Sequence, residues 1–497
     1  MELGQYGNMK DRIDPKVLVM TIIAIAMLVS VFHRSTVASF THDESYSFMY
    51  YPQLSFLDIV VHKESFTNNH LLNSLGMKCA GALFGTSELS MRSPNILAFI
   101  IYLTYAFLFL RRLDPVVACL GYLILVSNPI ILEMFSIARG YGISIGFMLM
   151  ALYHLTRALR SRRPSHIVLF HLAGILAVLG SFVLFGTYLA IFSTYVILRW
   201  IEIVRHRTGY SELRREAFFN GVMIFVAVGI LVIPIARTLS GNKLDFGGKE
   251  GFFDSTVFSV VASSIPGISI AGVQLPWIIA AAVAVSLFMF IASYRNGSVR
   301  SGAFTEERRT FIALAMVLFL TSLSIVLQHL LFNVDYPVAR FAIFLIPLAL
   351  LPLIFYGTAL RGRLVRLTHK VFIALFGLCS IVVLWPQFGP YRSVEWQYDL
   401  CTKEAVQLIV DDMDMEQLSD GSVELGITWL FEPTINYYRD HWGIAQLERM
   451  HRNGPGPNDA YRYLVKQDVD PKELEEFTLI KEFEVCGTVL YRRSPDN

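Results

Sequence analysis

Charged residues are scarce in this chain. They make up 16% of its 497 residues, whereas 54% are hydrophobic and the mean hydropathy is +0.51. Soluble domains carry about a quarter of charged residues, so the composition excludes a protein that is soluble throughout. Basic residues occur in short clusters between apolar runs rather than in one patch, so the net charge of +2 gives no indication of a nucleic-acid partner, and none is predicted. Such clusters are typical of loops between membrane spans.

Cysteines are also few. The five are not spaced as zinc or iron–sulfur ligands are. Cys401 and Cys486 lie in the polar C-terminal part, where a disulfide between them is possible if that part faces an oxidising compartment. No nucleotide-binding loop and no internal repeat is visible in the sequence. The first absence disfavours a nucleotide-sugar substrate, and the second disfavours a transporter built of repeated halves.

Apolar runs long enough to cross a bilayer, about 17 to 25 residues, dominate the first four fifths of the chain. Eleven such runs begin near Val17, Pro94, Pro115, Gly140, His166, Phe182, Phe219, Leu275, Thr310, Phe341 and Val371. The shorter apolar stretch from Leu71 to Phe84 is predicted to be an interfacial helix, because counting it as a span would invert every later loop. The sequence therefore predicts an α-helical polytopic membrane protein of about eleven transmembrane helices.

The distribution of arginine and lysine predicts the orientation. With the N-terminus in the cytoplasm, alternating connections hold clusters such as Arg111-Arg112 and Arg361–Lys370, while the connections on the other side hold few basic residues. The predicted domains are a catalytic membrane domain over residues 1–389, with its first outside loop at 34–91, and a small soluble α/β domain over residues 390–497. That second domain is predicted to lie on the outer, periplasmic or extracellular, side of the cell's inner membrane.

The C-terminal domain is predicted to contain two helices and two strands, with a further short helix. The helices are expected at Lys403 to Met413 and from Pro433 to Trp442, the strands at Ser422 to Thr428 and Gly487 to Arg492, and the short helix at Asp459 to Lys466.

Asp43 and Glu44 are the leading catalytic candidates. They stand in the first outside loop of a chain made mostly of membrane spans. A carboxylate at the membrane surface can remove a proton from a hydroxyl group within hydrogen-bond reach, and carboxylate oxygens beside a phosphate suit a Mg or Mn ion. The plain alternative is a solvated pair or an ionic partner for Arg34.

Three arginines on the same predicted face as Asp43 oppose the positive-inside trend. Arg92, Arg139 and Arg340 each stand at the outer end of a predicted span, where a planar guanidinium suits phosphate oxygens, although arginines at span ends can simply reach towards water. His70, after Asn68-Asn69, is predicted either to open the interfacial helix or to help bind a lipid-linked anion. Glu133 is a candidate partner for Arg139.

These segments resemble the polytopic membrane glycosyltransferases of the GT-C class, in the branch of protein O-mannosyltransferases and aminoarabinose transferases. The motifs are HDESYSF, NNHLLNSLGMKCAGALFGTSELSMRSPNIL and ARGYGISIGFMLMALYHL, with YPVARFAIFLIPLALLP later in the chain. The resemblance is clear over about residues 15 to 200 and diffuse beyond. It implies that Asp43 is the catalytic base, with Glu44 beside it, and that Arg92, Arg139 and Arg340 bind the donor phosphate. Many relatives have His-Pro-Pro where this chain has His70-Leu71-Leu72, so the role of His70 stays open.

The predicted function is therefore transfer of a sugar, with inversion, from a polyprenyl-phosphate donor to a hydroxyl of a protein, lipid or glycan acceptor at the outer face of the membrane. No cofactor is required by the sequence, and a divalent cation at Asp43 and Glu44 is left open. The alternative is a multispan transporter or flippase for lipid-linked or small polar substrates, for which charges near mid-membrane would be expected.

Overall fold

The structure is a computed structural model. It describes residues 14–494 except 64–67, 207–209, 241–246, 267–305, 360–362, 385–388, 390–391, 416–422 and 453. The predicted span beginning at Leu275 lies outside the described residues.

Long apolar helices form a bundle, as predicted. Within the described ranges, seven helices are long and apolar enough to cross a membrane: α1 (Pro15–Val37), α5 (Glu88–Leu110), α8 (Gly140–Ser161), α10 (Phe185–His206), α11 (Tyr210–Ser240), α14 (Glu306–Phe332) and α16 (Arg363–Leu384). Their outward surfaces carry exposed large apolar side chains, which is expected where lipid replaces water. The chain is a multi-pass membrane protein; the predicted number of about eleven spans is not confirmed.

The remaining membrane-domain helices are shorter. α6 (Pro115–Val126) and α7 (Pro129–Ser136) meet at an angle of 56° and would add an eighth span if counted as one. The sequence predicted one continuous span here, but Asn128 caps α7 and Pro129, which has no N–H, begins it. The others are α2 (His42–Tyr50), α3 (Phe56–Val60), α4 (Leu71–Phe84), α9 (Pro164–Gly180), α12 (Phe258–Ser264) and α15 (Leu345–Ala359), with short turns η1 (Phe182–Leu184), η2 (Phe252–Val257) and η3 (Ala339–Phe341).

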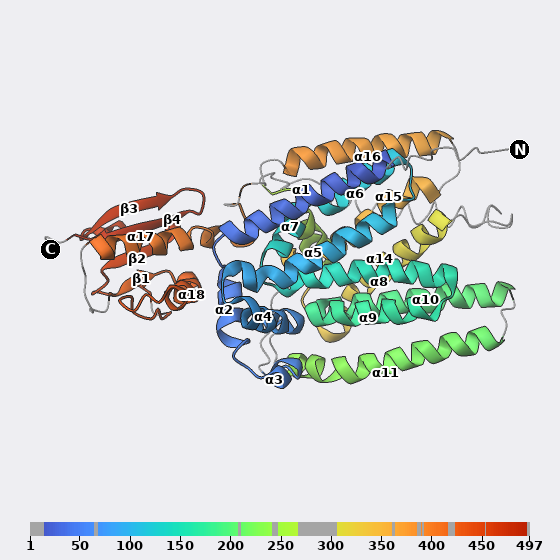
Figure 1. The fold of residues 1–497 in the computed structure, drawn as a ribbon, viewed down its shortest axis with the longest axis horizontal. Helices are drawn as coiled ribbons and strands as arrows, with labels where there is room; N and C mark the ends of the chain where they lie inside the picture. The colour runs from blue at the N-terminus through green and yellow to red at the C-terminus, as the bar shows by residue number, and fades with distance from the viewer. Residues whose placement is uncertain are drawn as a thin grey trace, which may run out of the picture.

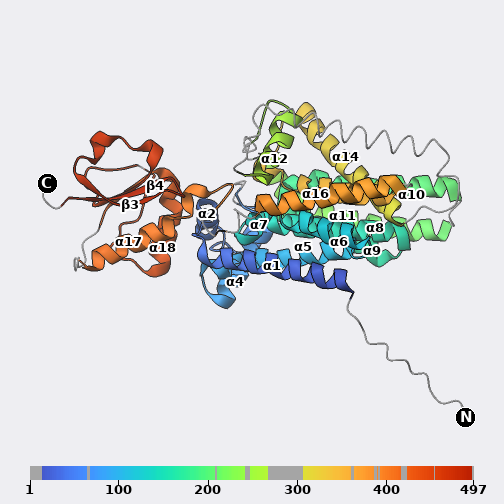
Figure 2. The same cartoon turned by 90° about the horizontal axis from the view of Figure 1, so that it is seen from above.

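The long helices run side by side, and the C-terminal unit, residues 392–494, lies beyond one end of the bundle (Figure 1). Both views place α2 and α4 at this end, with α2 next to the C-terminal unit (Figure 2). We call it the near end. At the opposite, far end, Arg112, Arg157 and Arg160 converge on Glu306 at the start of α14. The bundle thus separates the predicted catalytic segment from these basic connections.

The C-terminal unit has a four-stranded sheet in the order β1-β2-β4-β3, with β1 parallel to β2 and the other pairs antiparallel. Its elements are η5 (Gln397–Asp399), α17 (Thr402–Met415), β1 (Leu425–Ile427), η6 (Trp429–Phe431), α18 (Glu432–Trp442), β2 (Tyr461–Val465), η7 (Lys466–Asp468), η8 (Pro471–Leu474), β3 (Phe477–Phe483) and β4 (Thr488–Arg493). The two longer predicted helices and both predicted strands are confirmed.

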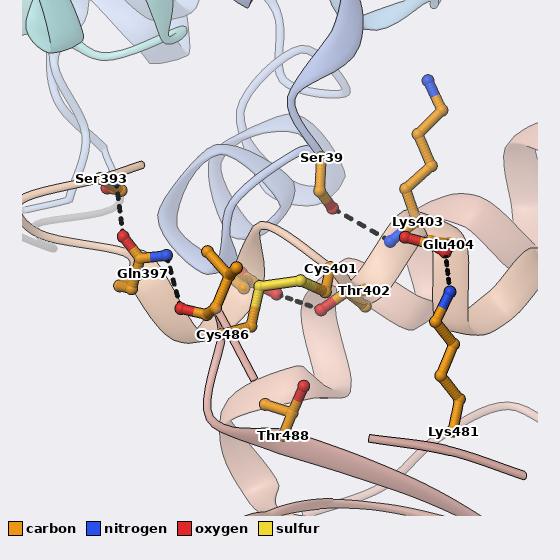
Figure 3. The surroundings of a disulfide bond; sticks show 12 residues. Ser39, Ser393, Gln397, Cys401, Thr402, Lys403, Glu404, Lys481, Cys486 and Thr488 are labelled. Carbon is orange, nitrogen blue, oxygen red and sulfur yellow. Dashed lines mark hydrogen bonds and ion pairs between the residues drawn. A yellow bond between two sulfur atoms is a disulfide. The ribbon is translucent and has the colours of Figure 1, made fainter. Parts of the chain in front are cut away.

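The short helix predicted at Asp459 to Lys466 is wrong, because this segment forms β2. β2 pairs with β1 on one side and β4 on the other, and buries Tyr461 and Tyr463. Aromatic residues fit a pleated, buried position well, and pairing on both edges outweighs local helix propensity. The disulfide left open in the sequence is present: Cys401 is bonded to Cys486 across 85 residues of sequence (Figure 3).

Candidate active site

Asp43 and Glu44 lie in the first turn of α2, which begins with a capping box. Thr41 Oγ1 accepts from the backbone N–H of Glu44, and the Glu44 carboxylate accepts from the backbone N–H of Thr41 (3.0 Å). This reciprocal arrangement satisfies two N–H groups that a helix start leaves unpaired. Successive residues of a helix point about 100° apart, so the two neighbouring carboxylates face different surroundings.

Glu44 is fully buried and forms a bidentate ion pair with Arg92 of α5. Arg92 Nε donates to Glu44 Oε1 (2.8 Å) and Nη2 donates to Oε2 (2.7 Å). The backbone N–H of Ala138, which precedes Arg139, also donates to Oε1. One carboxylate therefore joins α2, α5 and the segment that leads into α8.

The remaining donors of Arg92 bind the backbone at the end of α1. Nη1 donates to the carbonyls of Ser35 (3.1 Å) and Ala38 (2.9 Å), and Nη2 donates to that of Ser39 (2.7 Å). These bonds satisfy carbonyls at and just beyond the end of the helix. All five N–H groups of this buried guanidinium thus have partners within the protein, and none is left for the phosphate predicted to bind it.

Breaking this pair is expected to destabilise the membrane domain. Glu44→Gln leaves the Arg92 charge buried without its counter-ion, a change that typically costs about 3–5 kcal/mol. Thermal unfolding of the purified protein in nanodiscs measures the loss. Glu88→Gln is the matched control, because Glu88 pairs with the partly exposed Lys403 at 2.7 Å and its loss should lower the melting temperature much less. Equal melting temperatures for the two variants would contradict this assignment.

Asp43 turns to the other side of α2 and lies between two arginines. Its Oδ2 is 3.6 Å from Arg139 Nη2 and 3.6 Å from Arg340 Nη2. The side chain is 17% exposed, compared with 2% for Arg139 and 27% for Arg340. Residues separated by about 100 and 200 positions in sequence thus meet at the near end of the bundle. Of the three arginines predicted to lie with Asp43 and Glu44, Arg139 and Arg340 lie beside Asp43, whereas Arg92 pairs with Glu44. The chemical roles of these residues stay predictions.

Arg139 is placed by close packing around the ARGYG motif. It directly precedes α8, and a Cβ on the next residue, Gly140, would overlap the Gly180 carbonyl oxygen and lie 2.5 Å from His70 Cβ. Arg139 Nη1 donates to Ser47 Oγ (3.0 Å), whereas its buried Nε has no hydrogen-bond partner. A buried donor without a partner is unfavourable, so this Nε keeps an unused hydrogen-bonding capacity.

Arg340 sits on η3, in a bend where Ala339 takes a positive φ of 44°. Its Nη1 donates to Glu395 Oε2 (2.8 Å), and its guanidinium lies 5.0 Å from the centre of the Trp396 ring. Its Nε, like that of Arg139, is buried without a hydrogen-bond partner. Sequence reasoning missed Glu395 and Trp396. They stand between the predicted membrane domain and the C-terminal elements, and no local pattern signals their contact with Arg340.

His70 precedes α4 and lies against Tyr141, with the ring centres 4.7 Å apart. Its Nδ1 is 3.0 Å from the Gly180 carbonyl oxygen, which can only accept, so Nδ1 carries the hydrogen. Burial above all, and then the charge of Arg139, lowers the pKa of His70 well below its ordinary value. The ring is therefore neutral, and its buried, unpartnered Nε2 is an acceptor. A neutral Nε2 suits a hydroxyl group better than the phosphate predicted for it.

Glu133 of α7 fixes the segment that carries Glu395. Its carboxylate accepts from the Ser393 hydroxyl and from the Val394 N–H (2.7 Å), and it lies 3.7 Å from Arg34 Nη2. The partner predicted for Glu133 was Arg139; Arg34 takes that place. A cavity at this junction is lined by side chains that include Arg34, Glu133 and Arg392.

Asp43 is ionised at neutral pH in this environment. Burial by itself would raise the pKa of the carboxyl group, but the charges of Arg139, Arg340 and His42 outweigh it, so the pKa of Asp43 lies below its ordinary value. The carboxylate is thus in the form that can accept a proton.

The site does not fit a divalent cation held by Asp43 and Glu44. Glu44 is committed to Arg92 and Ala138, and the Asp43 carboxylate faces two guanidinium groups. Among the described residues, no group of three or more His, Cys, Asp or Glu side chains could hold a metal ion. Cationic side chains occupy the positions beside Asp43 where further oxygen ligands would have to lie.

Comparison with known proteins gives matches among solved structures only. No protein-family model and no curated protein sequence matches the chain. The structure is similar to ArnT from Cupriavidus metallidurans, with 11% identity, a TM-score of 0.49 and coverage of 96% of this chain and 98% of that chain. A second ArnT structure has undecaprenyl phosphate bound (12% identity, TM-score 0.46, coverage 97% and 98%).

Two further similar structures are larger proteins. An oligosaccharyltransferase from Archaeoglobus fulgidus has 14% identity and a TM-score of 0.42, with coverage of 90% of this chain and 68% of that one. Arabinosyltransferase EmbB from Mycobacterium smegmatis has 11% identity and a TM-score of 0.42, with coverage of 96% and 47%. These neighbours are GT-C glycosyltransferases, in agreement with the resemblance of the motifs. At such identities, and with TM-scores below 0.5, they do not assign an activity to this chain.

Proposed function

We propose that this protein is a membrane glycosyltransferase that moves a sugar from a polyprenyl-phosphate donor to a hydroxyl group of an acceptor. The observation that carries the proposal is the position of Asp43, 3.6 Å from both Arg139 and Arg340 at the end of an apolar helix bundle. A carboxylate beside two cations is what removal of a hydroxyl proton next to a departing phosphate requires.

In this mechanism the acceptor oxygen attacks the anomeric carbon from the face opposite the phosphate. The bond from that carbon to the phosphate oxygen breaks, and the bonding electrons leave with the polyprenyl phosphate. Arg139 and Arg340 stabilise the additional negative charge, and Asp43 takes the proton of the attacking hydroxyl. Attack from the opposite face inverts the anomeric centre.

The other predicted site residues take different roles in this proposal. Glu44 and Arg92 hold α2 against α5 and the end of α1, so that Asp43 keeps its direction. His70 accepts a hydrogen bond at Nε2 from a hydroxyl of the substrate. Glu395 and Trp396 hold the Arg340 guanidinium in place, leaving its Nε for the phosphate. No step uses a metal ion.

The direct test is release of the lipid phosphate. Purified protein in nanodiscs is incubated with a panel of undecaprenyl-phosphate-linked hexoses and pentoses and with protein, lipid and glycan acceptors, and free undecaprenyl phosphate is measured together with the glycosylated product. Undecaprenyl phosphate is the chosen lipid because a similar structure binds it. Transfer from at least one donor is expected. Movement of the intact lipid-linked sugar across the bilayer without transfer would support the alternative of a flippase.

The pH profile gives a further expected result. In the free protein the arginines keep the pKa of Asp43 below its ordinary value of 3.8, so kcat/KM should fall only when the pH drops below about that value. A bound phosphate neutralises the arginines and adds a like charge, and both effects raise the pKa of the Asp43 carboxyl group. The acid limb of kcat should therefore lie at a higher pH than that of kcat/KM. Coincident limbs would contradict a phosphate bound beside Asp43.

A further inference from the structure

One buried carboxylate has no part in the mechanism above. Asp399 ends η5 in the C-terminal unit and is fully buried. Its Oδ1 accepts from Thr402 Oγ1 (2.7 Å) and its Oδ2 accepts from Thr434 Oγ1 (2.9 Å). The backbone N–H of His42 also favours the charged form of this carboxylate and so lowers its pKa. His42 is the first residue of α2 and directly precedes Asp43. Through Thr434, whose hydroxyl lies 3.5 Å from Ser45 Oγ, this side chain of the C-terminal unit is linked to the first turn of the helix that carries the proposed base.

Other bonds dock the same turn of α2 onto the C-terminal unit. His42 Nδ1 donates to the Leu430 carbonyl (2.6 Å), and Ser45 Oγ lies 3.5 Å from Thr434 Oγ1. Just before the helix, the Phe40 N–H donates to the Tyr438 hydroxyl oxygen (2.7 Å). On its opposite side α2 is held by the Glu44–Arg92 pair. Asp43 therefore lies on a helix fixed between the two parts of the protein.

The segment that carries Asp399 is itself held firmly. Cys401, two residues later, is bonded to Cys486, and the Gln397 side chain joins the N–H of Ser393 (2.7 Å) to the Val485 carbonyl (2.8 Å). Figure 3 shows these contacts, together with the bond from the Lys403 N–H to Ser39 Oγ. The disulfide and the Gln397 bridge tie the segment to the turn between β3 and β4, so Asp399 has a fixed place from which to bind α2.

We propose that Asp399 is a positioning residue for Asp43: it fixes the first turn of α2 so that Asp43 faces the space between Arg139 and Arg340. Helix starts have N–H groups without intrahelical partners, and an anionic acceptor there is stabilising. Desolvation raises the pKa of Asp399 to about 7, so burying the carboxylate is unfavourable and the hydrogen bonds from Thr402 and Thr434 offset that cost only in part. The inference that Asp399 affects catalysis through Asp43 rests on the proposed function. The inference that Asp399 fixes the first turn of α2 does not.

The experiment compares Asp399→Ala with Asp459→Ala. Asp459 is also a buried carboxylate of the C-terminal unit, bonded to Arg462 and Gly456. Hydrogen exchange of α2 amides and the kinetics of sugar transfer from the active undecaprenyl-phosphate donor are measured for both variants. Asp399→Ala should speed exchange in α2 at least about tenfold and lower kcat by about 10²-fold, since small misplacements of reacting groups cost this much, with the donor KM within about threefold. Asp459→Ala should keep wild-type α2 exchange and kcat.

A second variant keeps the test decisive if Asp399→Ala does not fold. Thr434→Val removes the hydroxyl between Asp399 and Ser45 and should shift both readouts in the same direction by a smaller factor. Wild-type α2 exchange and kcat in the folded variant would overturn the inference, as would equal losses in Asp399→Ala and Asp459→Ala. Asp43→Asn is assayed alongside. If it keeps wild-type transfer, the assignment of Asp43 as the base fails; if no donor supports transfer by the wild-type protein, the proposed function fails; and if Asp43→Asn alone loses transfer, only the role of Asp399 fails.

Discussion

Asp43→Asn is expected to lower the rate of sugar transfer by about 10²–10⁴-fold, the usual contribution of a positioned general base. Asparagine has nearly the same shape but cannot take the proton of the attacking hydroxyl. The measurement is kcat/KM for release of undecaprenyl phosphate from the donor–acceptor pair that the wild-type protein uses. Asp43 also competes with the donor phosphate for Arg139 and Arg340, so the variant should bind undecaprenyl phosphate at least as tightly as the wild type.

The control for this variant is Asp58→Asn. Asp58 lies in the same stretch of chain at the start of α3, where it accepts from Ser55 Oγ and pairs with Lys63 at 3.3 Å. Its neutralisation should leave transfer unchanged. Loss of undecaprenyl phosphate binding in Asp43→Asn would show that the carboxylate supports donor binding rather than proton removal. Unchanged transfer would remove Asp43 from the chemistry.

Arg340→Lys is expected to lower kcat/KM by about 10²–10³-fold, the loss typical when one donor to a developing negative charge is removed. Lysine keeps the charge but lacks the planar fork that binds two phosphate oxygens, and it has no group at the position of the unpartnered Nε. Arg139→Lys should act in the same direction. The affinity of each variant for undecaprenyl phosphate is measured in nanodiscs. A weaker affinity than that of the wild type gives the part of the loss in kcat/KM that is due to ground-state binding.

Arg92→Lys separates this role from a structural one. Arg92 was predicted to belong with Arg139 and Arg340, yet its donors all face Glu44 and the end of α1. The variant should lower the melting temperature while the folded fraction keeps its affinity for undecaprenyl phosphate. Arg449→Lys, at a half-exposed arginine that pairs with Asp440, is the neutral control. A loss of lipid affinity in Arg92→Lys that matches Arg340→Lys would contradict the division of roles.

The sequence was sufficient to bring Asp43, Arg139 and Arg340 together, because all three interrupt apolar or weakly charged surroundings on one predicted side of the membrane. It was not sufficient to separate Asp43 from Glu44. The two carboxylates face different partners because the segment is a helix, α2, in which neighbouring side chains point about 100° apart: Glu44 faces Arg92 and Asp43 faces Arg139. From the sequence, this segment was treated as part of a loop. A polar stretch of nine residues with several aromatic and serine side chains carries no clear helical period.

Contacts between distant segments were the least predictable part of the site. Glu395 and Trp396 lie near Arg340 in a segment whose residues 393–395 are bound by the Glu133 carboxylate. Asp399 lies near the start of α2 where the C-terminal unit docks on this helix. The long helices were recognised from hydropathy, while the break at Asn128-Pro129 and the strand β2 depended on capping and on sheet pairing. The local sequence pattern therefore predicted the long helices and the proximity of Asp43 to Arg139 and Arg340. The packing of distant segments against each other determined which side chains contact these residues.

An experimental structure of the protein in nanodiscs with undecaprenyl phosphate tests the central proposal most directly. We predict that the phosphate lies within hydrogen-bonding distance of both the Arg139 and the Arg340 guanidinium groups, next to the Asp43 carboxylate. A phosphate bound instead in the cavity lined by Arg34 and Arg392, or at the arginines of the far end with the space beside Asp43 unoccupied, would contradict it.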